Sequence, residues 1–111
     1  MAQFVDVARL DHIVAGAAAL VTVGGTSVAV FNVNGELHAV EDACVNCASS
    51  IAAGVLVGSE VTCAGCGWCY DVTTGVVKSV PALRITTFEV KTVNARIMVA
   101  DSVKPDRDPG R

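Results

Sequence analysis

Apolar side chains alternate with polar ones, or run together in short valine-rich stretches, over much of this chain. A period of two and an abundance of β-branched residues indicate β-strands, whereas a helix needs apolar positions every three or four residues. The strands predicted before the first cysteine are 3–7, 19–23, 27–33 and 36–40. Gly24-Gly25 and Asn34-Gly35 predict tight turns, so the last three of these strands form an antiparallel meander. Only residues 13–20 leave a helical alternative open.

The pattern changes after residue 41, where glycine, cysteine and other small residues separate short apolar stretches. The strands predicted in this region are 55–57, 60–62, 68–72 and 76–78. Turns are predicted between them at Gly58-Ser59 and at Thr73-Thr74-Gly75. Longer strands return at 84–90 and 96–100 and meet near Asn94. The whole pattern predicts an all-β protein.

The length of 111 residues indicates one domain with one core, which we place at residues 1–103. Its scaffold of antiparallel strands comprises residues 1–41 and 82–100, and a cysteine-bearing subdomain at 42–81 is inserted into it. The tail at 104–111 holds two of the three prolines together with charged residues, which predicts disorder.

Composition and charge exclude two classes of partner. The net charge is −3 and no basic cluster appears, so the chain lacks the grouped Lys and Arg that bind nucleic acid. Hydrophobic residues make up 52%, which suffices for a core, but no apolar run is long enough to span a membrane. The apolar stretch at 13–23 follows two acids and lacks a basic start, so we expect no signal peptide there and a cytoplasmic protein, most simply a monomer.

Four of the five cysteines form two C-x2-C pairs, Cys44 with Cys47 and Cys63 with Cys66, separated by 15 residues. A C-x2-C loop turns back on itself and aims both sulfurs at one point, so two such loops can close a cage of four thiolates. The spacing therefore predicts a metal site with these four ligands. Zinc, a single iron and an iron–sulfur cluster all accept four thiolates, so the spacing leaves the metal open.

Other uses of these residues remain as alternatives. The cysteines could form disulfides in an oxidising compartment, and a C-x2-C pair can also perform thiol–disulfide exchange, although the βαβ context of that chemistry is missing. Cys69 alternates within a predicted strand and is interpreted as a small buried residue rather than a fifth ligand. His12 and His38 lie on scaffold segments and are not expected to be ligands.

The segment from Cys63 to Gly75 resembles the second cluster-binding segment of Rieske-type ferredoxins. That family reads Cys-Pro-x-His-Gly-Trp-x-Phe-Asp followed by a Thr-Gly turn, and here Gly67, Trp68, Asp71 and Gly75 match while Tyr70 supplies the aromatic residue. The strand 35–44 resembles the approach to the family's first segment, Cys-x-His. The likeness covers roughly residues 3–100 and implies a Rieske-like antiparallel scaffold.

This chain departs from the family at the ligands. In a Rieske centre two cysteines hold one iron and two histidines hold the other. Histidines are expected at positions 46 and 66, where Asn46 and Cys66 stand. Cys44 and Cys63 match the thiolate positions, Cys66 replaces one histidine, and Cys47 lies one residue beyond the other. Two charged thiolates in place of neutral imidazoles lower the reduction potential, from roughly −150 to +300 mV in Rieske centres toward about −400 mV in all-cysteine clusters.

The resemblance implies a small soluble ferredoxin that carries one electron between a reductase and an oxygenase or related enzyme. The expected cofactor is a [2Fe-2S] cluster on Cys44, Cys47, Cys63 and Cys66. Catalysis is not expected, because four protein thiolates leave a metal no open position. The alternative is a structural or assembly module with a single Fe or Zn in a rubredoxin-like site of four cysteines or with no metal, similar to the small subunits of nitrite reductases.

Overall fold

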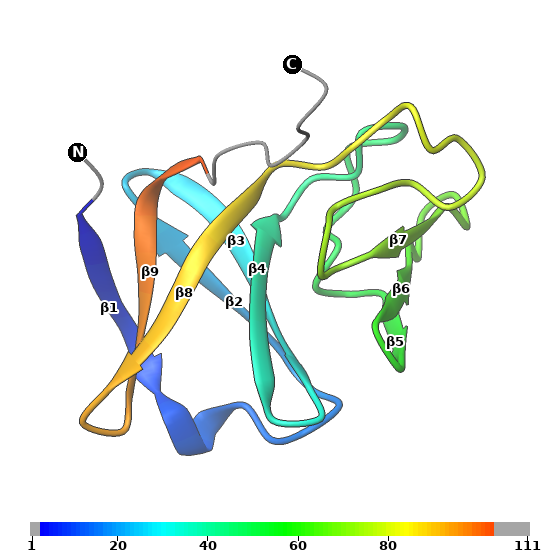
Figure 1. Ribbon diagram of the computed structural model, residues 1–111. Helices are drawn as coiled ribbons and strands as arrows, with labels where there is room; N and C mark the ends of the chain where they lie inside the picture. The colour runs from blue at the N-terminus through cyan, green and yellow to red at the C-terminus, as the bar shows by residue number, and fades with distance from the viewer. Residues whose placement is uncertain (1–2, 104–111) are drawn as a thin grey trace.

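Six antiparallel strands form the larger of two sheets in the computed structural model, which describes residues 3–103. Their order is β1 (Phe4–Arg9), β9 (Arg96–Val103), β8 (Thr87–Val93), β4 (Glu36–Glu41), β3 (Thr26–Val33) and β2 (Ala18–Val23). The sheet curls until its edge strands β1 and β2 come into contact (Figure 1). The meander predicted from the two tight turns is confirmed, because β2, β3 and β4 pair in sequence order.

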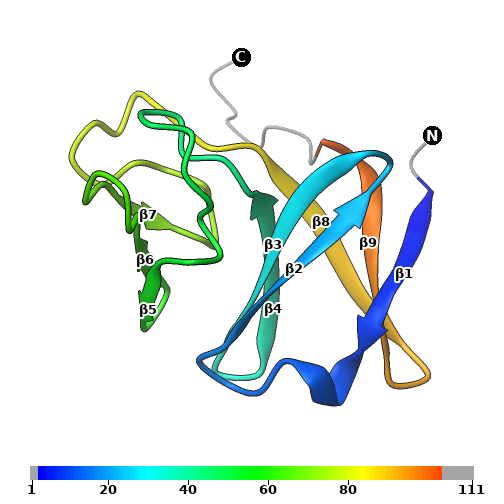
Figure 2. The same cartoon turned by 180° about the vertical axis from the view of Figure 1, so that it is seen from behind.

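A smaller sheet lies beside the larger one and carries the cysteine region (Figures 1 and 2). Its antiparallel strands are β5 (Val55–Val57), β6 (Glu60–Thr62) and β7 (Cys69–Asp71). The strand predicted at 76–78 is wrong, because Val76 and Val77 make only isolated bridges, to Arg84 and Tyr70. Arg84 pairs with Val76 in one of these bridges, and β8 begins at Thr87 rather than at residue 84 as predicted.

No helix forms over residues 13–20, so the helical alternative for this stretch is wrong. A short 3-10 helix, η1 (Leu10–His12), precedes a turn at Gly16, whose φ is +86°. The Gly16 N–H donates to the carbonyl of Asn32 at 2.8 Å, and the Asn32 side-chain amide donates to the Ile13 carbonyl at 2.7 Å. Bonds to β3 therefore replace the i to i+4 bonds of a helix and lead the chain into β2. Among residues 3–103, the structure holds no helix of the length and apolarity that a bilayer crossing requires.

Two buried clusters share the central strands of the large sheet. Side chains alternate along β3, so Val28 and Val30 join the cluster on one face while Ala29 and Phe31 join the cluster on the other. The cluster that contains Ala29 and Phe31 continues from the large sheet into the cysteine region. Its other members are Val40, Cys44, Ile51, Val61, Cys63, Tyr70, Val72, Val77 and Ile85. This shared core fixes the cysteine loops against the scaffold.

Candidate metal centre

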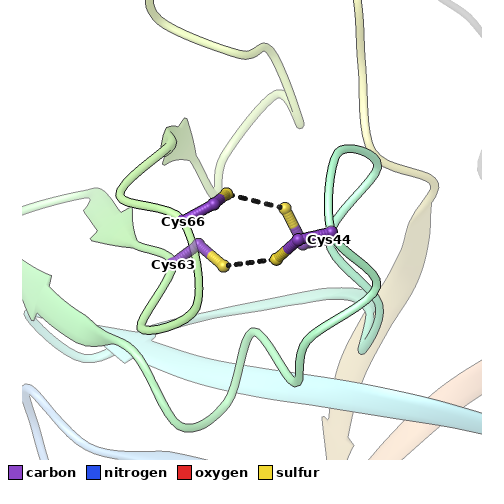
Figure 3. A group of neighbouring side chains, drawn as sticks. Cys44, Cys63 and Cys66 are labelled. Carbon is purple, nitrogen blue, oxygen red and sulfur yellow. Dashed lines mark hydrogen bonds between the residues drawn. The ribbon is translucent and has the colours of Figure 1, made fainter.

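The four paired cysteines meet at one point between two loops (Figure 3). Cys44 and Cys47 lie in the loop after β4, and Cys63 and Cys66 lie in the loop between β6 and β7. The Sγ atoms of Cys44 and Cys66 are 3.7 Å apart, and those of Cys47 and Cys63 are 3.6 Å apart. All four Sγ atoms lie within 4.8 Å of one another. The structure thus brings together the four cysteines that the spacing singled out.

The two loops have the same backbone construction. The first cysteine of each donates its N–H to the residue five positions later: Cys44 to the Ser49 carbonyl at 2.9 Å and Cys63 to the Trp68 carbonyl at 2.7 Å. Each loop therefore closes into a compact turn that presents its two thiols on the same side. The equivalence makes the pair of loops an approximate two-fold arrangement around the four sulfurs.

The residue after each second cysteine completes this construction. Ala48 has a φ of +66° and Gly67 a φ of +83°, and their N–H groups donate to the carbonyls of Cys44 at 2.8 Å and Cys63 at 2.9 Å. Glycine adopts a positive φ without steric cost, whereas Ala48 carries the strain of its Cβ. A strained non-glycine residue at this place indicates that the surrounding loop holds the turn firmly.

Burial divides each pair into an inner and an outer cysteine. Cys44 and Cys63 are only 4% and 2% exposed, whereas Cys47 and Cys66 are exposed to solvent. Burial raises the pKa of the Cys63 thiol to about 11. Burial also raises the pKa of Cys44, but hydrogen bonds from Tyr70 and from the loop amides outweigh it and bring that pKa down to about 6. The inner cysteines thus shield the centre from water, and the outer ones face the surface.

Tyr70 forms the closest polar contact to an inner sulfur. Its hydroxyl oxygen is 3.1 Å from Cys44 Sγ and accepts the Val45 N–H at 3.0 Å. Either atom can donate while Cys44 carries its proton, but a thiolate can only accept, so in that form the Tyr70 O–H donates to the sulfur. Burial, followed by the neighbouring Cys44 sulfur, raises the pKa of Tyr70, which keeps it protonated as a donor. The sequence identified Tyr70 only as an aromatic match, because a contact 26 residues away leaves no local signal.

The outer cysteine of the first loop contacts Ser49. The Ser49 hydroxyl lies 3.3 Å from Cys47 Sγ and lowers the pKa of this thiol by hydrogen bonding to its thiolate form. A Cβ added at Gly65 would collide with Ser49 Oγ and lie 3.0 Å from Cys47 Sγ. The two loops therefore touch at this point, which only a glycine at position 65 permits.

The remaining candidate residues lie away from the four sulfurs. The Cys69 thiol donates to Glu60 at 3.5 Å, and Glu60 also pairs with Lys78 at 3.0 Å. His38 pairs with Glu36 at 3.0 Å, and His12 lies in η1. Neither Cys69 nor a histidine belongs to the group of possible metal ligands found among residues 3–103.

Replacing Cys69 with alanine is expected to leave the metal content unchanged and to lower stability only modestly. The substitution removes a half-buried sulfur and a long hydrogen bond, which together contribute about 1 kcal/mol. Metal analysis and chemical denaturation of the variant beside the unchanged protein provide the measurement. A marked fall in metal content would show that Cys69 is a ligand.

The family model of the Rieske [2Fe-2S] domain matches residues 3–93. This chain belongs to the Rieske family. Among its relatives, the ferredoxin component of the naphthalene 1,2-dioxygenase/salicylate 5-hydroxylase systems of Ralstonia sp. is 34% identical, over 87% of this chain and 94% of the relative. The ferredoxin component of the naphthalene 1,2-dioxygenase system of Pseudomonas putida is 31% identical over the same shares.

Solved structures of the family agree with this assignment. The ferredoxin of carbazole 1,9a-dioxygenase from Nocardioides aromaticivorans IC177 superposes with a TM-score of 0.84 at 26% identity, over 90% of this chain and 99% of that one. A chain of the complex of reduced oxygenase and oxidized ferredoxin in carbazole 1,9a-dioxygenase superposes with a TM-score of 0.85 at 28% identity. The match covers 93% of this chain and 97% of that one. The Rieske-like all-β fold expected from the sequence is confirmed.

The Rieske assignment and the ferredoxin relatives support a [2Fe-2S] cluster as the cofactor, as the resemblance implied. The donor chemistry of the site agrees with this group, because four cysteine thiolates are the ligand set of all-cysteine [2Fe-2S] clusters. Asn46 and Cys66 occupy the places of the family's histidines, so the side chains gathered here are four cysteines rather than two cysteines and two histidines.

Proposed function

We propose that this protein is an electron carrier that passes single electrons from a reductase to an oxygenase or a related enzyme. The observation that carries the proposal is the cage of four cysteine sulfurs set on the scaffold of dioxygenase ferredoxins. The relatives are ferredoxin components of oxygenase systems rather than the catalytic enzymes, and four thiolates offer no open position to a substrate. The chain is thus a component of an oxidoreductase system and not itself an enzyme.

The four ligands have different roles in this proposal. Cys44, Cys47, Cys63 and Cys66 would hold the cluster, which supplies a reversible store for one electron when it is bound. The buried Cys44 and Cys63 exclude water from the inner side. The exposed Cys47 and Cys66 lie where a partner protein can approach, so they offer the short path for the electron.

The partners follow from the relatives. One structural neighbour is a ferredoxin in complex with its oxygenase, and the curated relatives are named as ferredoxin components of dioxygenase systems. We assign a reductase and an oxygenase, or a similar terminal enzyme, as the partners of this chain, and the cytoplasm as its location. In this account residues 1–103 act as one domain in which residues 42–81 form the metal-binding subdomain.

Electron transfer can be tested with the protein as purified anaerobically. An NAD(P)H-dependent ferredoxin reductase and cytochrome c serve as donor and acceptor, and the rate of cytochrome c reduction is measured against the concentration of this protein. The rate is expected to rise in proportion to the protein added. A rate that stays at the level of reductase alone, with protein of full iron content, would contradict the proposed function.

Replacing Tyr70 with phenylalanine is expected to lower the reduction potential of the bound centre by about 40 mV, equivalent to ~1 kcal/mol for one electron. The hydroxyl donates to Cys44 Sγ at 3.1 Å and so stabilises the reduced, more negative state. The midpoint potential is measured in a redox titration, with Cys69→Ala as the control that leaves this bond intact. An unchanged or higher potential in Tyr70→Phe, at equal iron content, would show that the bond does not reach the centre.

A further inference from the structure

The distances within the four-sulfur cage match the coordination of one ion. With metal–sulfur bonds of about 2.3 Å, the sulfurs of a tetrahedral site lie about 3.8 Å apart. The two contacts between the loops, Cys44 to Cys66 and Cys47 to Cys63, are 3.7 and 3.6 Å, and no sulfur is more than 4.8 Å from another. We propose that this site also takes a single tetrahedral metal ion, zinc or iron, when no sulfide is supplied.

A binuclear cluster places different demands on the loops. Each of its two irons binds two of the four protein sulfurs, and the bridging sulfides lie between the irons. The two pairs of sulfurs then lie at opposite ends of the cluster, farther apart than the edge of one tetrahedron. In the family's arrangement Cys44 and Cys63, one from each loop, share an iron, so the outer sulfurs must move away from the inner ones to admit the cluster, whereas a single ion needs no movement.

The contact between the loops favours the closed arrangement. Gly65 lies against Ser49 Oγ and Cys47 Sγ so closely that an added Cβ would collide with the hydroxyl. The side chain of Cys66 stands where the family has a histidine, and a thiolate is shorter than an imidazole. A shorter ligand reaches less far toward a second, outer iron, and the close contact of the loops holds Cys47 Sγ near the other three sulfurs.

The symmetry of the loops supports the same conclusion. Both have an N–H to carbonyl bond that spans the loop and a residue of positive φ after the second cysteine. Paired C-x2-C loops are the construction of four-cysteine sites that hold one ion tetrahedrally. Soft thiolate ligands in this geometry select zinc and iron among the divalent metals.

Binding of the metal ion releases protons from the cysteine thiols. Each thiol that still carries its proton releases it to solvent as the sulfur binds the divalent ion, so four thiolates around one ion give the site a net charge of −2. No oxidant or reductant takes part. The proposal rests on the same four cysteines as the proposed electron carrier but not on electron transfer itself.

Cobalt(II) in place of zinc tests the proposal, because tetrahedral thiolate cobalt is coloured. The full-length chain is freed of iron under reducing conditions, refolded anaerobically without sulfide, and titrated with Co²⁺ followed by Zn²⁺. We expect tetrahedral absorption bands that saturate at one equivalent and disappear at one equivalent of Zn²⁺. Cys69→Ala should give the same titration, and Cys66→Ser should bind Co²⁺ at least ~100-fold more weakly, since losing even a hydrogen bond behind a ligand weakens binding about 10- to 100-fold.

Saturation at two equivalents, absorption typical of six-coordinate cobalt, or no saturable binding would each overturn the proposal. Equal Co²⁺ affinity in Cys66→Ser would overturn the ligand set. These outcomes are independent of the proposed function, because electron transfer is assayed on protein that keeps the iron it was purified with. A protein that does not bind one equivalent of Co²⁺ but stimulates cytochrome c reduction would be an electron carrier whose site accepts the cluster and not a single ion.

Discussion

Cys63→Ser is expected to abolish metal binding and to unfold most of residues 42–81. Cys63 is 2% exposed and belongs to the core cluster that joins the small sheet to the scaffold, with its sulfur 3.6 Å from that of Cys47. A serine hydroxyl does not replace a thiolate ligand, and a metal held by four cysteines contributes folding free energy directly, on the order of 10 kcal/mol. Iron analysis and amide hydrogen exchange over 42–81 measure the two effects.

Cys44→Ser is expected to behave in the same way, because Cys44 is the inner ligand of the other loop. Cys69→Ala is the matched control, since it removes a cysteine from the same subdomain but not from the cage. Full metal content in either Cys44→Ser or Cys63→Ser would overturn the assignment of the ligands.

Gly75→Ala is expected to destabilise the protein by about 3 kcal/mol, from a strained backbone and a steric collision. Gly75 has a φ of +84°, and an added Cβ would collide with the carbonyl oxygen of Ile85 and lie 2.9 Å from Thr87 Cγ2. The Gly75 carbonyl accepts the Ile85 N–H at 2.8 Å, so the substitution also strains the bond that ties the turn to the start of β8. Chemical denaturation of the metal-loaded protein measures the loss.

Gly58→Ala is the control that separates the effect of backbone strain on stability from the effect of the steric collision. Gly58 also has a positive φ, +62°, but a Cβ added there meets no atom within 4 Å. The free energy of unfolding of Gly58→Ala should therefore fall by only ~1 kcal/mol, the cost of the backbone strain. Equal losses in the two variants would show that the contact with Ile85 is unimportant.

The sequence predicted the scaffold well, because its signals are local. Glycine pairs and Asn34-Gly35 mark the hairpins, and the continuous apolar run of β3 is explained by its burial on both faces. The C-x2-C spacing identified four cysteines that the structure brings within 4.8 Å of one another. Each of these predictions needed only neighbouring residues or a repeated motif.

The errors arose where distant segments decide the structure. The conformation of residues 13–20 is set by hydrogen bonds to Asn32 of β3, not by the spacing of their own apolar side chains. Val76 pairs with Arg84 instead of extending a hairpin strand. The hydrogen bond from Tyr70 to Cys44 joins residues 26 apart, and the contact of Gly65 with Ser49 joins the two loops. None of these contacts leaves a pattern in the local sequence. Residues 104–111, predicted to be a disordered tail, lie outside the described residues.

We propose that four cysteine thiolates on this Rieske scaffold hold a [2Fe-2S] centre that stores one electron. A reductive titration of anaerobically purified protein, followed by visible absorption and EPR, tests it most directly. We expect reversible uptake of one electron per chain at a potential below the Rieske range, which begins at about −150 mV, because two charged thiolates replace neutral imidazoles. A protein that takes up no electron would contradict it, and so would a midpoint within the Rieske range.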